Sequence, residues 1–243
     1  MKIVVIVQAR MTSTRLPGKV LCEVMGKPLL EYQIERLRQV TQADELIIAT
    51  TTNDTDQPII ELCKRLGVAY YRGPEEDVLS RYYEAAAQFG ADVVVRVTSD
   101  CPLIDPGVMD EVISLYINNY EKYDYVSNTL ERTYPRGLDT EVFSMAALEK
   151  ACREAREKPE REHVTLFMYR RPEQFRLANS SNAIDYSQHR WTLDTPEDFQ
   201  FIKLILQELY PLNSRFTWME LIGLLNEHPE WVQINAAVKQ KEL

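Results

Sequence analysis

The sequence predicts an α/β protein built on a three-layer, mostly parallel sheet. Short runs of β-branched residues, typical of strands buried on both faces, alternate with segments of helical periodicity over residues 2–120. Glycine follows two of these periodic segments, at Gly67 and Gly90, where it allows the left-handed turn that commonly ends a helix. This alternation indicates right-handed βαβ units, which place helices on both faces of a parallel sheet.

The first half of the chain supplies the regular elements. Residues 29–40 place Leu30, Ile34 and Leu37 at the spacing of an amphipathic helix. Pro106 stands in the first turn of the helix expected over residues 105–120, where a missing N–H costs little. We therefore expect strands over residues 2–8, 45–50, 68–71 and 92–97, and helices over residues 29–40, 55–66, 77–89 and 105–120.

The second half of the chain loses this rhythm. We expect strands over residues 123–128, 138–143, 175–178 and 189–193, and helices over residues 145–156, 160–170, 195–209 and 218–226. No segment rich in Gly, Pro or Ser separates the halves. We therefore expect one domain over residues 1–243, with a regular half over residues 1–122 and a less regular half over residues 123–243.

Composition limits the classes of function. The net charge of −9 and the pI of about 5.0 argue against a broad nucleic-acid interface, which needs clustered Lys and Arg. The four cysteines form no CxxC pair, so we expect reduced thiols and no zinc site. No apolar stretch approaches the roughly 18 residues of a membrane span, and no secretory signal is evident. We expect a cytoplasmic protein without nucleic-acid or membrane partners.

A polar loop follows the first expected strand. Within ten residues it carries Arg10, Arg15 and Lys19, three hydroxyl side chains and a Pro-Gly turn. Arg forks onto phosphate oxygens, Lys acts as a point charge, and loop N–H groups fill the remaining positions. A solvated basic loop would explain one such cation, but it explains three poorly. We therefore interpret the segment as a phosphate-binding loop, in which Arg10 and Lys19 are solvent-side residues that the fold does not need.

Two carboxylates stand at the ends of expected strands. Asp100 follows the strand over residues 92–97, and Asp194 follows the strand over residues 189–193. Helix capping is the alternative role, but Asp105 and Thr195 stand directly before the prolines that open the next helices and fit that role better. Because Mg²⁺ takes one or two carboxylates plus phosphate oxygens, Asp100 is a candidate Mg²⁺ ligand. Because Thr195 can cap the helix, Asp194 is free for another role, and on spacing alone a role in the site stays open.

Four motifs stand out along the chain: ARMTSTRLPGK at residues 9–19, TSDCPL at 98–103, GLDTEVF at 137–143 and LDTPED at 193–198. They resemble the motifs of the sugar-acid cytidylyltransferases, the family that includes the CMP-KDO and CMP-sialic acid synthetases. The match spans nearly the full length and looks closest to the spore coat polysaccharide biosynthesis protein F branch. The resemblance implies a nucleotide-diphospho-sugar transferase (GT-A-like) fold. It also implies a nucleotide-binding half over residues 1–122 and an acceptor and metal half over residues 123–243.

The resemblance assigns roles to individual residues. It implies catalytic roles for Arg10, Lys19 and Asp100, and Mg²⁺ ligation by Asp100 and Asp194. It implies nucleotide binding by Ala9, Arg10, Ser13, Arg15, Lys19, Arg81 and Arg96. Arg81, taken as bare sequence, is only a charge on a helix. Arg96 departs from the family, whose members commonly carry a Gln before this strand exit that helps to read cytosine, so the identity of the base stays open.

The family places its sugar site in the second half of the chain. Arg136, Glu141, Arg161 and His163 combine cations with hydroxyl-binding carboxylates there, as an anionic sugar requires. We expect these four residues to bind the acceptor. Ordinary helix and strand surface is the alternative for each residue taken alone.

The expected reaction is Mg²⁺-dependent cytidylyl transfer. A hydroxyl of an anionic sugar attacks the α-phosphorus of CTP, giving a CMP-sugar and pyrophosphate for surface polysaccharide biosynthesis. Related enzymes are dimers, so the resemblance also implies a homodimer. A nucleotide-sugar-dependent glycosyltransferase is one alternative, although no Asp-x-Asp motif follows the strand over residues 92–97. A non-catalytic nucleotide-binding subunit of a polysaccharide assembly is the other, although a scaffold needs no pair of metal carboxylates.

Overall fold

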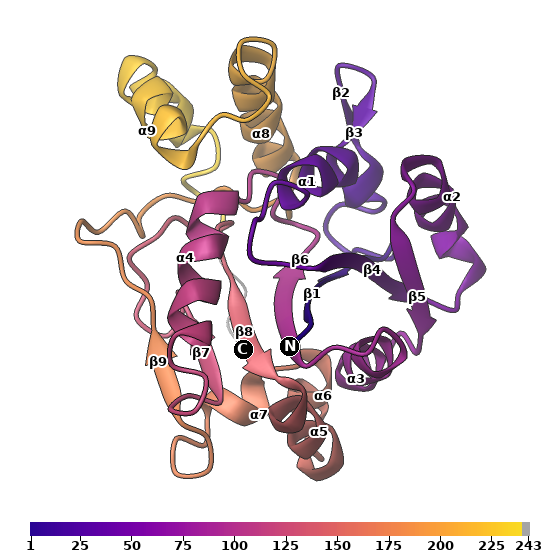
Figure 1. Ribbon diagram of the computed structural model, residues 1–243. Helices are drawn as coiled ribbons and strands as arrows, with labels where there is room; N and C mark the ends of the chain where they lie inside the picture. Colours follow the sequence, from indigo (N-terminus) through magenta and orange to yellow (C-terminus); the bar gives the residue numbers. More distant parts are fainter. Residues whose placement is uncertain (240–243) are drawn as a thin grey trace.

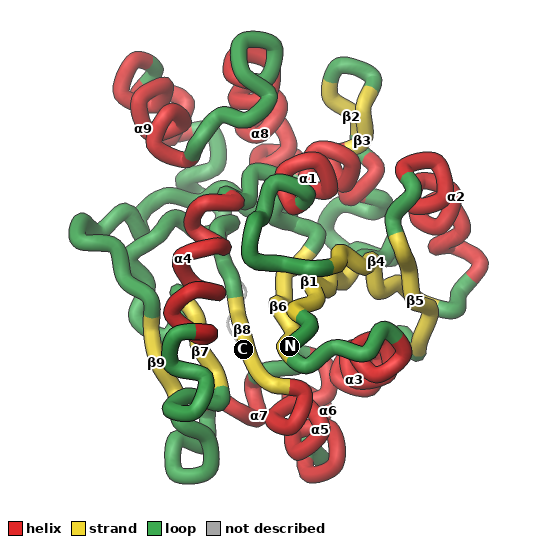
Figure 2. Tube along the Cα trace, viewed as in Figure 1, coloured by secondary structure: helices red, strands yellow, loops and turns green. Residues whose placement is uncertain are grey.

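The computed structural model describes residues 1–239, and a seven-stranded sheet forms its centre (Figures 1 and 2). In spatial order the strands are β5 (Ala69–Gly73), β4 (Glu45–Thr51), β1 (Ile3–Gln8), β6 (Val93–Thr98), β8 (Glu141–Ser144), β7 (Tyr125–Ser127) and β9 (Leu177–Asn179). Strands β5, β4, β1 and β6 run parallel, β8 is antiparallel to both of its neighbours, and β9 is parallel to β7. The mostly parallel α/β sheet predicted from the sequence is confirmed.

Helices cover both faces of the sheet. One face carries α1 (Leu29–Leu37), α2 (Gln57–Leu66) and α4 (Pro106–Ile117). The other carries α3 (Val78–Gln88), α5 (Met145–Glu154) and α7 (Leu166–Tyr169), with α6 (Lys158–Glu162) packed against α3. The helices predicted in the first half therefore lie where βαβ units place them, within a few residues of the expected ends.

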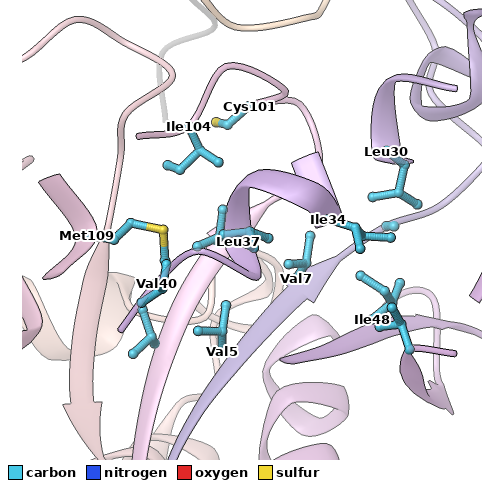
Figure 3. Close-up of a cluster of buried hydrophobic side chains, with 14 of the residues drawn as sticks. Val5, Val7, Leu30, Ile34, Leu37, Val40, Ile48, Cys101, Ile104 and Met109 are labelled. Carbon is cyan, nitrogen blue, oxygen red and sulfur yellow. The ribbon is translucent and has the colours of Figure 1, made fainter. Parts of the chain in front are cut away.

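The central strand β1 is buried on both faces because its side chains alternate between two hydrophobic clusters. Val5 and Val7 belong to the cluster under α1, α2 and α4. Figure 3 shows both valines with Ile34 of α1 and with other members of this cluster. Val4 and Ile6 pack on the opposite face, under α3 and α5. A continuous β-branched run is the sequence that this two-sided burial requires.

A third cluster forms outside the sheet. It joins α8 (Pro196–Leu209) and α9 (Trp218–Glu227) to Leu138, Trp191 and Leu193. Thr195 caps α8 in a capping box with Asp198, and Asp105 caps α4, as predicted. The remaining short elements are η1 (Lys19–Leu21), β2 (Glu23–Val24), β3 (Lys27–Pro28), η2 (Asp54–Asp56) and η3 (Pro229–Gln233).

Three predictions for the second half were wrong in detail. Residues 189–193 form no sheet strand, because Trp191 and Leu193 turn into the third cluster and only Arg190 makes a bridge, to Arg136. Strand β8 starts at Glu141 rather than at residue 138, since the preceding chain also enters that cluster. The helix expected over residues 160–170 is two short helices, broken where Val164 takes a φ of 50°.

No helix within residues 1–239 is both long enough and apolar enough to cross a membrane.

Candidate active site

A cleft of about 1080 Å³ opens at the carboxyl ends of β1 and β6. Ligands bind at this edge in open α/β sheets because the loops that follow parallel strands converge there. The cleft brings together most of the residues singled out in the sequence. They are Ala9, Arg10, Ser13, Arg15, Lys19, Arg81, Arg96, Asp100, Arg136, Glu141, His163 and Asp194.

The predicted phosphate loop curls along one wall of this cleft. Its shape is set by the N–H groups of Ser13 and Gly18, which both donate to the carbonyl of Met11, and by a φ of 68° at Gly18. Two arginines of the loop remain accessible: the side chain of Arg10 is 42% exposed and that of Arg15 is 40% exposed. Cations presented in this way can approach a polyphosphate without first being uncovered.

Lys19 is the exception, and its expected solvent-side position was wrong. Its Nζ lies 2.9 Å from Asp194 Oδ1 and 3.7 Å from Asp100 Oδ2, and it donates to the carbonyl of Leu193 at 2.7 Å. Burial acts to lower the pKa of Lys19, but the two carboxylates outweigh burial and raise it above its usual value. Because η1 turns the chain inward at Lys19, the ammonium joins two carboxylates that lie 94 residues apart in the sequence.

Asp194 lies at the centre of a set of cations. Its Oδ1 accepts from Lys19 and lies 3.0 Å from Arg15, while its Oδ2 accepts from Arg190 at 2.8 Å. Burial raises the pKa of Asp194, but these cations, led by Lys19, outweigh it and lower the pKa below its usual value. Arg190 also binds the buried Asp198, so the position of Asp194 is tied to the start of α8. Asp194 therefore stays ionised.

The two carboxylates differ in their fitness for a metal ion. Asp100 is 26% exposed at its side chain, and Lys19 is the cation that lies near it, at 3.7 Å. Both oxygens of Asp194 are engaged by protein cations. Within residues 1–239, no three His, Cys, Asp or Glu side chains gather as a metal site. A Mg²⁺ ion held here would need phosphate oxygens to complete its shell, which is its usual mode with nucleotides.

Arg81 and Arg96 form part of the cleft on the α3 side. Arg81 is 1% exposed and donates to the carbonyl of Pro74 at 3.3 Å, so it is far more than a surface helix charge. Arg96 is paired with Glu141 and donates to Oε1 of Gln8 at 3.1 Å. Burial lowers the pKa of Arg96, but the Glu141 carboxylate outweighs it, so the guanidinium stays charged.

The four expected acceptor residues separate into two groups. Arg136 and His163 line the cleft, and Glu141 does so with its carboxylate already bound by Arg96, Thr165 and Tyr125. The structure does not bring Arg161 into the cleft wall. Its guanidinium instead binds Asp77, at the start of α3, and the carbonyl of Cys152 in α5, because α6, which carries Arg161, packs against α3.

The family model described as cytidylyltransferase matches residues 4–217, which covers both walls of the cleft. The chain belongs to the cytidylyltransferase family. Nucleotidyl transfer is therefore its class of activity.

Individual cytidylyltransferase relatives agree. The spore coat polysaccharide biosynthesis protein SpsF of Bacillus subtilis is 34% identical over 235 residues, covering 94% of this chain and 95% of that protein. The solved structure of a cytidylyltransferase from Leptospira borgpetersenii is 32% identical, with a TM-score of 0.92 and full coverage of both chains. A CMP:2-keto-3-deoxy-manno-octonic acid synthetase solved with CTP has a TM-score of 0.67 at 18% identity, covering 86% of this chain and 99% of that one. This last similarity supports the nucleotide-diphospho-sugar transferase fold alone.

Sequence reasoning missed several residues of the cytidylyltransferase cleft. Arg132 and Asp139 form a two-point ion pair on its wall, with distances of 2.5 and 2.8 Å, and Gln8 lies on it beside Arg96. Asp139 stands inside the quoted GLDTEVF motif, which was the available signal. Arg132 had no signal beyond its charge, since the loop that carries it has no period.

Proposed function

We propose that this cytidylyltransferase joins CTP to an anionic sugar and releases pyrophosphate, as a step of surface polysaccharide biosynthesis. One observation carries the proposal: Lys19 and Arg15 of the polar loop meet the carboxylates of Asp100 and Asp194 in the cleft. Arg132 and Arg136 line the same cleft, where a second, negatively charged substrate would find cations. The name of the SpsF relative supports a polysaccharide pathway.

The reaction needs no protein nucleophile. A hydroxyl oxygen of the sugar forms a bond to the α-phosphorus of CTP, and the bond from that phosphorus to the bridging oxygen of the β-phosphate breaks. Pyrophosphate takes up the electron pair and leaves along the accessible cations Arg10 and Arg15, and the hydroxyl proton passes to solvent. The ammonium of Lys19, between Asp100 and Asp194, offsets the negative charge that develops on the phosphates. The protein contributes positioning and charge complementarity.

We infer that Mg²⁺ takes part, held by Asp100 and, through exchange of its present cation partners, by Asp194. The ion would supply Lewis-acid neutralisation of phosphate charge. The donor chemistry fits, because Asp100 is an accessible carboxylate next to a phosphate loop.

A substrate screen tests the proposal. The four nucleoside triphosphates are incubated with a panel of sugar acids and matched neutral sugars, and pyrophosphate release is followed with Mg²⁺ present and after chelation. We expect release only from CTP with a sugar acid, and loss of release on chelation. Consumption of a nucleotide-sugar without pyrophosphate would favour the glycosyltransferase alternative. Triphosphate binding without turnover across the panel would favour a non-catalytic role. Lys19→Met and Asp100→Asn are the matched inactive variants.

A further inference from the structure

The last residue of β1 presents a polar group that the reaction above does not use. Gln8 is in register with Ala49 on β4 and Thr98 on β6, and its side chain lines the cleft. It comes directly before the phosphate loop. Along the strand it follows Val4 and Ile6 at period two, so it projects on the sheet face that carries Arg96 and α3.

The orientation of the Gln8 amide is determined by its neighbour. Arg96 Nη2 donates to Oε1 of Gln8 at 3.1 Å. A guanidinium only donates hydrogen bonds, so the amide atom that faces it must be the oxygen. The Nε2 of Gln8 has no hydrogen-bond partner among residues 1–239 and is not among the buried unpaired atoms. The cleft is therefore offered the N–H donors of Gln8, while the amide oxygen is turned toward Arg96.

Arg96 is itself held in place. Its guanidinium pairs with Glu141 and lies 5.8 Å from the ring centre of Tyr82. The Glu141 carboxylate also accepts from the hydroxyls of Tyr125, at 2.6 Å, and Thr165. Turning the Gln8 amide over would set its NH₂ group against a fixed, charged donor and lose the existing bond. Arg96 and Glu141 are thus positioning residues for Gln8.

We propose that Gln8 reads the N3 edge of the pyrimidine and that the Arg96–Glu141 pair, by keeping its amide donor-out, selects cytosine over uracil. Cytosine N3 is an acceptor, whereas uracil carries an N–H there and would oppose the Gln8 donor. The order of the chain places the base. If the loop that starts at Arg10 holds the phosphates, the nucleoside lies near Gln8, which directly precedes that loop, and near the apolar side chain of Val78 at the start of α3.

This assignment rests on the proposed use of CTP, and it changes the meaning of Arg96. On the sequence, Arg96 left the identity of the base open. In the structure Nη1 of Arg96 binds Glu141 and Nη2 binds Gln8, while its Nε is buried and has no hydrogen-bond partner among residues 1–239, so Arg96 acts through Gln8 rather than on the base.

The test measures equilibrium binding of CTP and of UTP, without acceptor, by isothermal titration calorimetry on the full chain. We expect wild type to bind CTP at least about tenfold more tightly than UTP, since a donor facing a donor leaves both unpaired. Gln8→Leu should bring the two dissociation constants within about threefold, because the discriminating group is gone. Gln8→Glu, which offers only acceptors, should turn the preference toward UTP.

A second variant tests the positioning residues. In the double variant Arg96→Met/Glu141→Gln the amide is free to turn over, so the CTP/UTP ratio should fall mainly through tighter UTP binding. If Arg96 and Glu141 had a purely structural role, the double variant would instead bind both CTP and UTP more weakly, by the same factor. Gln207→Leu, the same substitution on an exposed position of α8, is the control and should leave the ratio unchanged.

Three results would overturn the assignment. Equal affinities of wild type for CTP and UTP would refute the assignment of Gln8 but not the proposed nucleotidyl transfer. An unchanged ratio of the CTP and UTP dissociation constants in Gln8→Leu would also refute the assignment. A raised acceptor KM in Gln8→Leu with both nucleotide affinities preserved would assign Gln8 to the sugar. Failure of wild type to bind any triphosphate would refute the proposed function itself, and the role of Gln8 with it.

Discussion

Replacing Lys19 by Met should lower both stability and activity, whereas replacing an exposed cation of the same loop should lower only activity. Met keeps most of the methylene packing of Lys and removes the ammonium. In the structure the Lys19 side chain is 13% exposed, and its ammonium contacts Asp194, Asp100 and the carbonyl of Leu193. The variant therefore leaves two carboxylates facing each other without the cation between them.

The size of the effect follows from what remains around Asp194. A hydrogen bond to a charged group is worth about 1.5–3 kcal/mol, and an uncompensated buried charge costs more. Asp194 keeps Arg190 and Arg15, which limits the loss. We expect the free energy of unfolding to fall by about 2 kcal/mol, which lowers the Tm of a chain of this size by about 4–8 °C. The rate should fall by about 10²–10³-fold.

The pH dependence of this difference has a defined sign. The pKa of Lys19 is raised in the folded state, so its contribution is complete below the ordinary value of 10.5 and is lost as the pH rises through the folded pKa. The pKa of Asp194 is lowered, so its contribution is present above 3.8 and is lost as the pH falls through the folded pKa. The stability difference between wild type and Lys19→Met should be flat between these limits and shrink outside them.

Thermal unfolding by circular dichroism and pyrophosphate release measure the two effects separately. Arg10→Met is the matched control: the Arg10 side chain is 42% exposed and lies 3.3 Å from Glu75. It should lose activity on the same scale but change the unfolding free energy by less than about 0.5 kcal/mol. Equal Tm values for wild type and Lys19→Met at neutral pH would refute the view that Lys19 joins the two carboxylates.

Three further predictions follow from the same geometry. Arg136→Ala and His163→Ala should raise the acceptor KM while the CTP dissociation constant stays near that of wild type, and an equal loss of CTP affinity would contradict their place on the sugar side. Asp100→Asn should lower the rate by at least about 10²-fold with little change in Tm, and should need more Mg²⁺ for half-maximal rate; activity insensitive to chelation would contradict the metal role. Gly137→Ala should lower the unfolding free energy by about 2–4 kcal/mol, because Gly137 has a φ of 107° and a Cβ there would lie 2.8 Å from the carbonyl oxygen of Trp191. A denaturant titration measures this loss, and a smaller loss would mean that the backbone at Gly137 relaxes.

The sequence by itself determined the parallel strands of the first half and the polar loop that follows β1. A strand buried on both faces needs a continuous β-branched run, and residues 2–8 provide one whose alternate side chains fill opposite clusters. Helix limits in the first half were equally local, because glycine and proline act through their own backbone conformations. The cations Arg10 and Arg15 were recognisable because three charges in ten residues after a buried strand have few structural uses.

Only the tertiary structure decided which charges are paired. Arg96 and Glu141 lie 45 residues apart in the sequence, and each was expected to bind a different substrate, yet they form one ion pair beside Gln8. Lys19 was expected in solvent and lies between two carboxylates of the cleft, whereas Arg161 was expected in the cleft and pairs with Asp77 instead. Ion pairing depends on distance in space, and no local pattern encodes the distance between strands that neighbour each other only after the sheet has formed.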